Sequence, residues 1–115
     1  MKIIIYLFLL VVTSCENNIE SDYVTYDCEV LESLYEESVA PILANQCTAC
    51  HSSSHKSGNL ALDSYDAAID GIMNGHVLSR IIMDTSNPLF MPLGSEKLSQ
   101  ESIEVLQNFA EQLCL

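Results

Sequence analysis

Apolar residues recur with the period of an α-helix in two parts of the chain, one between residues 31 and 43 and one at its end. In the first part, glutamates separate the members of an apolar stripe made of Leu31, Leu34, Tyr35, Val39, Ile42 and Leu43. Pro41 interrupts this stripe, so we expect one helix before it and a short second turn that runs into Cys47. In the last part, Ser99 and Glu101 suit the cap and first turn of a helix. That helix carries a single apolar stripe of Ile103, Leu106, Phe109, Ala110 and Leu113.

The middle of the chain predicts two short helices. Asp63 or Ser64 can cap a helix over residues 65–70, and Gly71 is expected to end it because glycine favours the position after a helix. A second helix is expected over about residues 76–83, where apolar side chains are available to pack against the rest of the domain.

The remaining segments predict loops. Residues 52–59 are rich in serine, and residues 84–96 contain Pro88, Pro92 and Gly94, which are incompatible with a regular element. No strand is predicted. The expected fold class is therefore an all-α domain of short helices with much loop.

The N-terminus has the pattern of an export signal. Met1-Lys2 supplies a positive charge, and residues 3–12 form an apolar run that is too short to span a bilayer. The run ends in Val12-Thr13-Ser14-Cys15, which resembles a bacterial lipobox, so we expect cleavage before Cys15 and a lipid on that cysteine. The alternative is an ordinary secretory signal with a chance cysteine. Both versions predict an exported, periplasmic protein.

These features divide the chain into three parts. Residues 1–14 are expected to be a lipoprotein signal peptide, residues 15–27 a polar tether to the membrane, and residues 28–115 one small domain. Glu16-Asn17, directly after the lipidation site, contains no cue for retention at the inner membrane, which favours the outer membrane.

Acidic residues dominate the charge. The whole chain has a net charge of −12, and removal of the signal peptide takes away one of its four basic residues. Such a surface argues against binding nucleic acid or anionic lipid headgroups, and it suits a partner protein with a basic face. The alternative meaning of the charge is simple solubility.

Cys47-Thr48-Ala49-Cys50-His51 is the segment with the clearest chemistry. Two thiols on one turn can each add across a haem vinyl group, and the imidazole that follows can bind the iron, so the pattern indicates a c-type haem attachment site. The alternatives are half of a zinc site and a thioredoxin-like redox pair. Zinc requires further ligands at a matching second pair, and a redox pair expects a βαβ context; the sequence offers neither.

The other cysteines have separate expected roles. With Cys15 assigned to the lipid and the motif cysteines to haem, Cys28 and Cys114 remain. Two remaining cysteines in an oxidising compartment usually pair, so we expect a Cys28–Cys114 disulfide, with free thiols as the alternative.

A second axial ligand decides whether the iron is closed or open to small molecules. The candidates are Met73, Met83, Met91, His55 and His76. Met91 is favoured because it lies in a loop stiffened by prolines just before the final helix, which can present a thioether with few conformations to lose. His76 is the alternative distal ligand, since the other methionines suit packing and His55 follows the motif too closely.

The order of motifs resembles the small monohaem class I cytochromes c, and within them an exported bacterial lipoprotein branch. The resemblance covers about residues 39–114 and rests on the lead-in Val39-Ala40-Pro41-Ile42-Leu43, the CxxCH motif, Gly58-Asn59-Leu60-Ala61-Leu62-Asp63-Ser64-Tyr65, Met91-Pro92 and Leu98-Ser99. It departs from the family pattern at Leu93, where a second proline is frequent, and at Phe109, where tryptophan is frequent.

The resemblance implies a cytochrome c-like fold of short helices wrapped around one covalently bound haem c. It implies thioether bonds at Cys47 and Cys50, His51 as the proximal iron ligand and Met91 as the distal ligand. The function it implies is electron transfer between redox partner proteins by a membrane-anchored carrier, without enzyme activity. The alternatives are a haem enzyme or small-ligand-binding module with an open distal site, and a lipoprotein that uses haem structurally.

Overall fold

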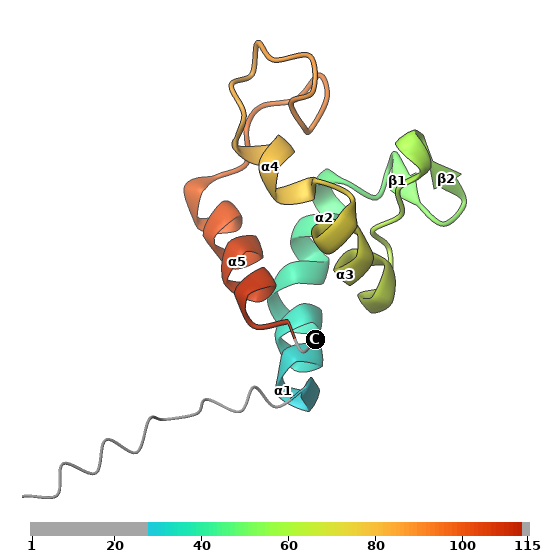
Figure 1. Cartoon of the computed structure of the whole chain (residues 1–115), viewed down its shortest axis with the longest axis vertical. Helices are drawn as coiled ribbons and strands as arrows, with labels where there is room; N and C mark the ends of the chain where they lie inside the picture. The colour runs from blue at the N-terminus through green and yellow to red at the C-terminus, as the bar shows by residue number, and fades with distance from the viewer. Residues whose placement is uncertain (1–27, 114–115) are drawn as a thin grey trace, which may run out of the picture.

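The computed structural model describes residues 28–113, and this part of the chain is mostly helical, which confirms the all-α fold class (Figure 1). Its elements are α1 (Cys28–Leu34), the π-helical η1 (Tyr35–Val39), α2 (Ala40–Gln46), β1 (His51–Ser52), β2 (His55–Lys56), the 3-10 helix η2 (Ser57–Asn59), α3 (Tyr65–Asn74), α4 (Val77–Ile82) and α5 (Gln100–Glu111). Among the described residues, no helix combines the length and the apolar character needed to cross a membrane.

The first three elements form one continuous helix through Pro41, so the expectation that Pro41 would divide it is wrong. The backbone stays in the right-handed helical region at the junctions, Leu34 and Ala40. The helix widens into a π-helix just before the proline, and the Ala40 N–H donates to the Tyr35 carbonyl, five residues back. Pro41 then lies in the first turn of α2, where its missing N–H removes few backbone hydrogen bonds from the helix.

The core lies where this long helix, α3, α4 and α5 meet. Its largest fully buried side chains are Val39, Leu43, Leu106 and Phe109. Rings from three elements also meet there: the Tyr35 and Tyr65 centroids lie 5.3 Å apart in an edge-to-face arrangement, and Phe109 lies 6.1 Å from Tyr35. Such ring pairs add to the stabilisation that burial gives, so they join the first helix to α3 and α5.

Helix α3 runs through Gly71 to Asn74, so the expected end at Gly71 is wrong. Gly71 is buried, and a side chain there would meet Leu62 and Leu60. The glycine therefore permits close packing of α3 on the segment before it. Of the two predicted caps, Ser64 is the one used, because its hydroxyl accepts from the Ala67 N–H at 3.3 Å.

The expectation of a loop without strands over residues 52–59 is also wrong. Two short antiparallel strands, β1 and β2, pair His51 with Lys56 and Ser52 with His55. We call residues 51–56 the His51 hairpin. The Ser52 hydroxyl accepts from the His55 N–H at 3.2 Å, which supports the tight turn between the strands.

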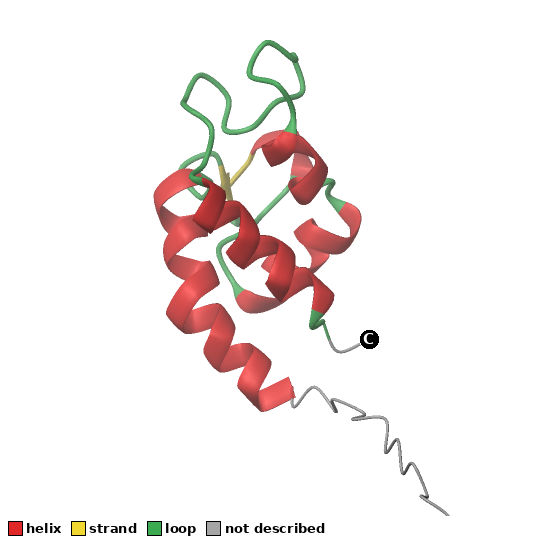
Figure 2. Cartoon of the chain, turned by 90° about the vertical axis from the view of Figure 1, so that its left-hand side faces the viewer, coloured by secondary structure: helices red, strands yellow, loops and turns green. Residues whose placement is uncertain are grey.

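The last third of the domain agrees with the sequence prediction. Helix α4 falls within the expected range, and α5 is capped by the Ser99 hydroxyl, which accepts from the Ser102 N–H. Residues 83–99 contain no helix or strand, and we call them the Met91 loop. Figures 1 and 2 place this loop and the His51 hairpin toward the same end of the domain, opposite the start of α1.

Candidate functional site

The CxxCH motif forms a tight turn at the end of α2. The Leu43 carbonyl accepts from the N–H groups of Cys47 and Thr48 at 2.8 and 3.0 Å. The Cys47 carbonyl then accepts from Cys50 and His51 at 3.1 and 2.9 Å. Since Leu43 is buried in the core, the long first helix fixes where the motif begins. The three motif side chains thus leave the backbone within one turn of chain.

Both motif cysteines are free thiols, but their surroundings differ. Cys50 is exposed, whereas Cys47 is partly buried, and this burial raises the pKa of the Cys47 thiol to about 11. Cys47 is therefore a neutral thiol near pH 7, and its side chain packs against the hydrophobic core. Within residues 28–113 no three histidine, cysteine or carboxylate side chains converge on a point that could hold a metal ion, so the motif is not part of a chelating cluster there.

The imidazole of His51 is held in one orientation by the backbone. Its Nδ1–H donates to the Ser57 carbonyl at 2.9 Å, because a carbonyl oxygen can only accept. In the neutral ring the lone pair then lies on Nε2, which is the nitrogen available to a metal. A hydrogen bond from the ring nitrogen that does not bind the metal is the arrangement that orients histidine ligands in metal sites.

The segment after the hairpin holds His51 in place. The Leu62 N–H donates to the His51 carbonyl at 2.8 Å, and the Ser57 N–H donates to the Cys50 carbonyl at 3.0 Å. The chain turns back between these bonds at Gly58, with φ of 64°, and Asn59, with φ of 59°. Positive φ is readily adopted by glycine and tolerated by asparagine, so these two residues allow both Ser57 and Leu62 to bond to His51.

Asp63 fastens the tip of the His51 hairpin, a role that the sequence alone did not predict. Its Oδ2 accepts from the Ser53 N–H at 2.8 Å and from the Ser53 hydroxyl at 2.7 Å. These hydrogen bonds, from the backbone N–H and then the hydroxyl, hold the pKa of the Asp63 carboxyl below its usual range. A carboxylate at this position therefore ties the hairpin to the segment that leads into α3.

Met91, the favoured distal ligand, lies half-buried in the Met91 loop after the buried Phe90. Its N–H donates to the Arg80 carbonyl at 3.3 Å, which attaches the middle of the loop to α4. The Met91-Pro92 peptide bond is cis.

The other candidate ligands have different places. His76 is exposed at the start of α4, in the left-handed region with φ of 58°. Met83 directly follows α4 and is partly buried, Met73 is 46% exposed on α3, and His55 is exposed in β2. Because His55 and Met73 are exposed, no surrounding side chains hold either of them in an orientation suited to binding an iron.

A cavity of about 790 Å³ opens at the base of the Met91 loop. Its lining comes from Gln46 of α2, Thr85, residues 94–98, Ser99 and Ser102. Neither the motif nor Met91 lines this cavity, although Gln46 directly precedes Cys47. The assignment of the site therefore rests on the motif and on its hydrogen bonds.

Two of the expected site residues, Cys15 and Cys114, lie outside the described part of the chain, and the expected partner of Cys28 is one of them. Cys15 and Cys114 are not among residues 28–113, so lipidation and the proposed pairing stay predictions. Cys28, the first residue of α1, is disulfide-bonded rather than free.

The donor set fits a covalently attached haem: two free thiols in one turn, followed by an imidazole whose Nδ1 is already occupied. The sequence model of a family described as Planctomycete cytochrome C matches residues 47–92, so the match begins at Cys47 and ends just after Met91. This match supports a cytochrome c-type domain, a class of haem proteins that carry covalent haem c and transfer electrons. No similar curated protein and no similar solved structure was found.

Proposed function

We propose that the chain is a monohaem c-type cytochrome that carries electrons between partner proteins. The observation that carries this proposal is the His51 imidazole, which follows two free thiols and donates from Nδ1 to the Ser57 carbonyl at 2.9 Å. A bound haem would supply an iron that takes up one electron as Fe(III) and releases it as Fe(II).

The residues of the chain would hold the haem and set its surroundings. Cys47 and Cys50 would form the two thioether bonds, and His51 would bind the iron through Nε2. The hydrogen bond from Nδ1 keeps the ring in one orientation and makes Nε2 a better electron donor. Fixed ligands favour a carrier, because little has to move when the electron arrives or leaves.

We infer that Met91 is the second axial ligand, with His76 as the alternative. Support comes from the hydrogen bond that attaches the backbone of Met91 to Arg80 of α4, and from the place of Met91 within the family match. A thioether ligand raises the reduction potential relative to a second imidazole. Closing both axial positions would favour electron transfer over reaction with small molecules.

A visible spectrum of the exported protein, combined with a redox titration, tests both proposals. We expect the spectrum of covalent haem c and, in the oxidised protein, the far-red band of an iron–thioether bond. Met91→Ala should remove this band, whereas His76→Ala and the matched control Met73→Ala, an exposed methionine, should keep it. A wild-type protein that lacks the band and binds cyanide rapidly would instead support the haem enzyme with an open distal site.

We also propose that the chain is exported and anchored in a membrane, with the outer membrane favoured, by a lipid on Cys15. Support comes from the signal pattern of residues 1–15. Labelling with a radioactive fatty acid should mark the wild-type protein and not Cys15→Ala. Equal labelling of both would contradict the anchor.

The Cys28–Cys114 disulfide remains part of the proposal. Cys28 is disulfide-bonded, and α5 ends toward the same end of the domain at which α1 begins (Figures 1 and 2). Peptide mapping without reduction should recover Cys28 and Cys114 in one linked fragment. A fragment linking Cys28 to any other cysteine would contradict the pairing.

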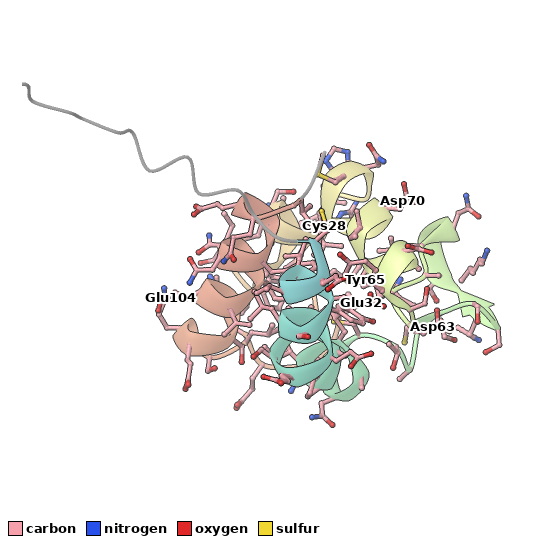
Figure 3. All side chains as sticks on the ribbon, turned by 90° about the horizontal axis from the view of Figure 1, so that it is seen from below. Cys28, Glu32, Asp63, Tyr65, Asp70 and Glu104 are labelled. Atoms are coloured by element: carbon pink, nitrogen blue, oxygen red, sulfur yellow. The ribbon has the colours of Figure 1, made fainter. Side chains whose placement is uncertain are left out.

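A redox partner with a basic face is supported by the placement of the glutamates. Residues 28–46 carry Glu29, Glu32, Glu36 and Glu37 and no basic residue. Seen from the end at which α1 begins, acidic side chains lie on several elements, including Glu32 on the first helix, Asp70 on α3 and Glu104 on α5 (Figure 3). Steering by these charges predicts that electron transfer to a cationic mediator slows as salt is added, and a flat rate would remove the steering.

A further inference from the structure

Lys97, near the C-terminal end of the Met91 loop, hydrogen-bonds to the end of α4. Its Nζ donates to the Ile82 carbonyl at 2.8 Å and to the Met83 carbonyl at 3.1 Å. The last carbonyls of a helix have no partner within the helix, and the C-terminal end carries partial negative charge. A lysine ammonium therefore suits this position on both counts, and its hydrogen bonds are strengthened by the charge.

These two bonds close the Met91 loop at its base. Met83 and Lys97 are separated by most of the loop, and Leu98, the next residue, is buried in the core. The Met91 N–H bonds to the Arg80 carbonyl on the same turn of α4. The loop is thus attached to α4 at two places, one at its base and one at the proposed ligand.

The other hydrogen bonds of this loop among the described residues are local. They join residues no more than four positions apart, for example Asn87 to Asp84, Phe90 to Asn87 and Ser95 to Pro92. Such bonds shape individual turns but do not hold the loop against the domain. Opening the base would release conformational entropy in a segment otherwise held by the buried Phe90 and Leu98 and by the Met91–Arg80 bond of 3.3 Å.

We propose that Lys97 is a positioning residue for Met91: its ammonium closes the loop on α4 and sets how much of the time the thioether is presented to the iron. The inference rests on the proposed role of Met91 as a ligand and deepens it. Lys97 is exposed, so its loss should change loop opening much more than global unfolding.

The test compares three variants of the full-length haem protein with the wild type. Lys97→Met removes both hydrogen bonds, Lys97→Arg keeps a cation with donors, and Lys56→Met makes the same charge change in β2. The first measurement is the hydrogen-exchange rate of the Met91 amide by NMR. The second is the apparent affinity of the oxidised iron for added imidazole, which competes with Met91 and which the far-red band follows.

We expect Lys97→Met to raise both quantities by about tenfold, because the two lost hydrogen bonds share one exposed ammonium and together should contribute about as much as one charged hydrogen bond. Lys97→Arg should stay within about twofold of the wild type on both measurements, since it restores the bond. Lys56→Met should do the same, and exchange of α5 amides should be unchanged in all variants. An unchanged Lys97→Met, or an equal effect of Lys56→Met, would overturn the proposal.

Two further outcomes separate this inference from the proposed function. If the wild type lacks the far-red band, the ligand role of Met91 fails and with it the inference, whatever the exchange data show. If Lys97→Met does not fold, Lys97→Ala, which also removes the donor, is measured in the same way. An amide of Met91 that exchanges at the wild-type rate in Lys97→Ala overturns the closure of the loop by Lys97, even where Met91 is the ligand.

Discussion

Replacing Gly71 with alanine tests how tightly the core packs behind the candidate site. Gly71 lies buried in α3, and a Cβ atom at this position would lie 3.0 Å from Leu60 Cδ1 and closer still to Leu62 Cδ2. Leu62 matters for the site because its N–H donates to the His51 carbonyl at 2.8 Å. A shift of Leu62 would therefore be transmitted to the proximal histidine.

Two opposing effects set the sign of this prediction. Glycine to alanine inside a helix normally stabilises a protein by about 1 kcal/mol. An added methyl in a packed core costs about 1–3 kcal/mol when its neighbours cannot move. Leu62 is only 2% exposed, so its side chain cannot move out into solvent, and we expect the steric cost to exceed the helix gain. We expect Gly71→Ala to lower the free energy of unfolding by about 1 kcal/mol, or about 4–8 °C in Tm.

The assay is urea and thermal unfolding of the full-length protein, followed by far-ultraviolet circular dichroism, in a double-mutant cycle with Leu62→Ala. Truncating Leu62 removes the closest obstacle, so Gly71→Ala should be neutral or stabilising in that background. The coupling energy should then be about 1–2 kcal/mol, well above the scatter for independent sites. A stabilising Gly71→Ala in the wild-type background, or additive effects of the two changes, would refute the packing argument.

Three smaller predictions address the hairpin, the alternative ligand and the last helix. Because the pKa of Asp63 is lowered in the folded state, its carboxylate stabilises the fold fully above the unfolded aspartate pKa of about 3.9, and this contribution is lost as the pH falls through the folded pKa. Asp63→Asn should therefore flatten the pH dependence of urea unfolding below about pH 4. An unchanged pH dependence would contradict this stabilising role of Asp63. Asparagine tolerates the backbone φ of 58° at His76, so His76→Asn should change the free energy of unfolding in urea by less than about 0.5 kcal/mol. The variant should also keep the far-red band, and loss of the band would identify His76 as the ligand. Ser99→Ala should cost about 1 kcal/mol in the same unfolding assay, because the Ser102 N–H loses its acceptor, and a change near zero would contradict this role as a cap.

The sequence predicted the elements whose signals are local. The serine cap of α5 and the irregular Met91 loop depend on residues within a few positions of each other, and both are as expected. Pro41 was misjudged because the local rule does not include tertiary packing. Val39 and Leu43, on either side of it, are both buried, and one π-helical turn lets the helix continue and bury them together.

Gly71 was misjudged for a related reason. A glycine after a short apolar run has the pattern of a helix end, yet here it is a position at which α3 packs closely against Leu60 and Leu62. The true end lies at Gly75, whose N–H donates to the Gly71 carbonyl. Two glycines four residues apart offered both possibilities, and only the packing partner from outside the helix decides between them.

The candidate site likewise has a part that local sequence signals predict and a part that depends on residues farther along the chain. The CxxCH motif is contiguous, so its chemistry could be predicted directly from the sequence. The residues that position it, Ser57 and Asp63, act on the hairpin from six and ten residues away. Their roles depend on the turn at Gly58 and Asn59, and that glycine–asparagine pair was the available signal for a chain reversal after the motif.

The glutamates of residues 28–46 also determine how the domain would turn as it approaches a charged body. Along a helix that rises 1.5 Å per residue, Glu37 and Glu29 lie about 15 and about 27 Å from Cys47. The basic residues among the described positions, Lys56, Arg80 and Lys97, lie instead on the hairpin, α4 and the Met91 loop. This separation makes the domain an electric dipole, and a positively charged surface would capture the end farthest from the motif. If the domain transfers electrons as proposed, we expect a productive partner to carry its basic region well to one side of its own redox centre, so that binding of the glutamates leaves the motif facing that centre.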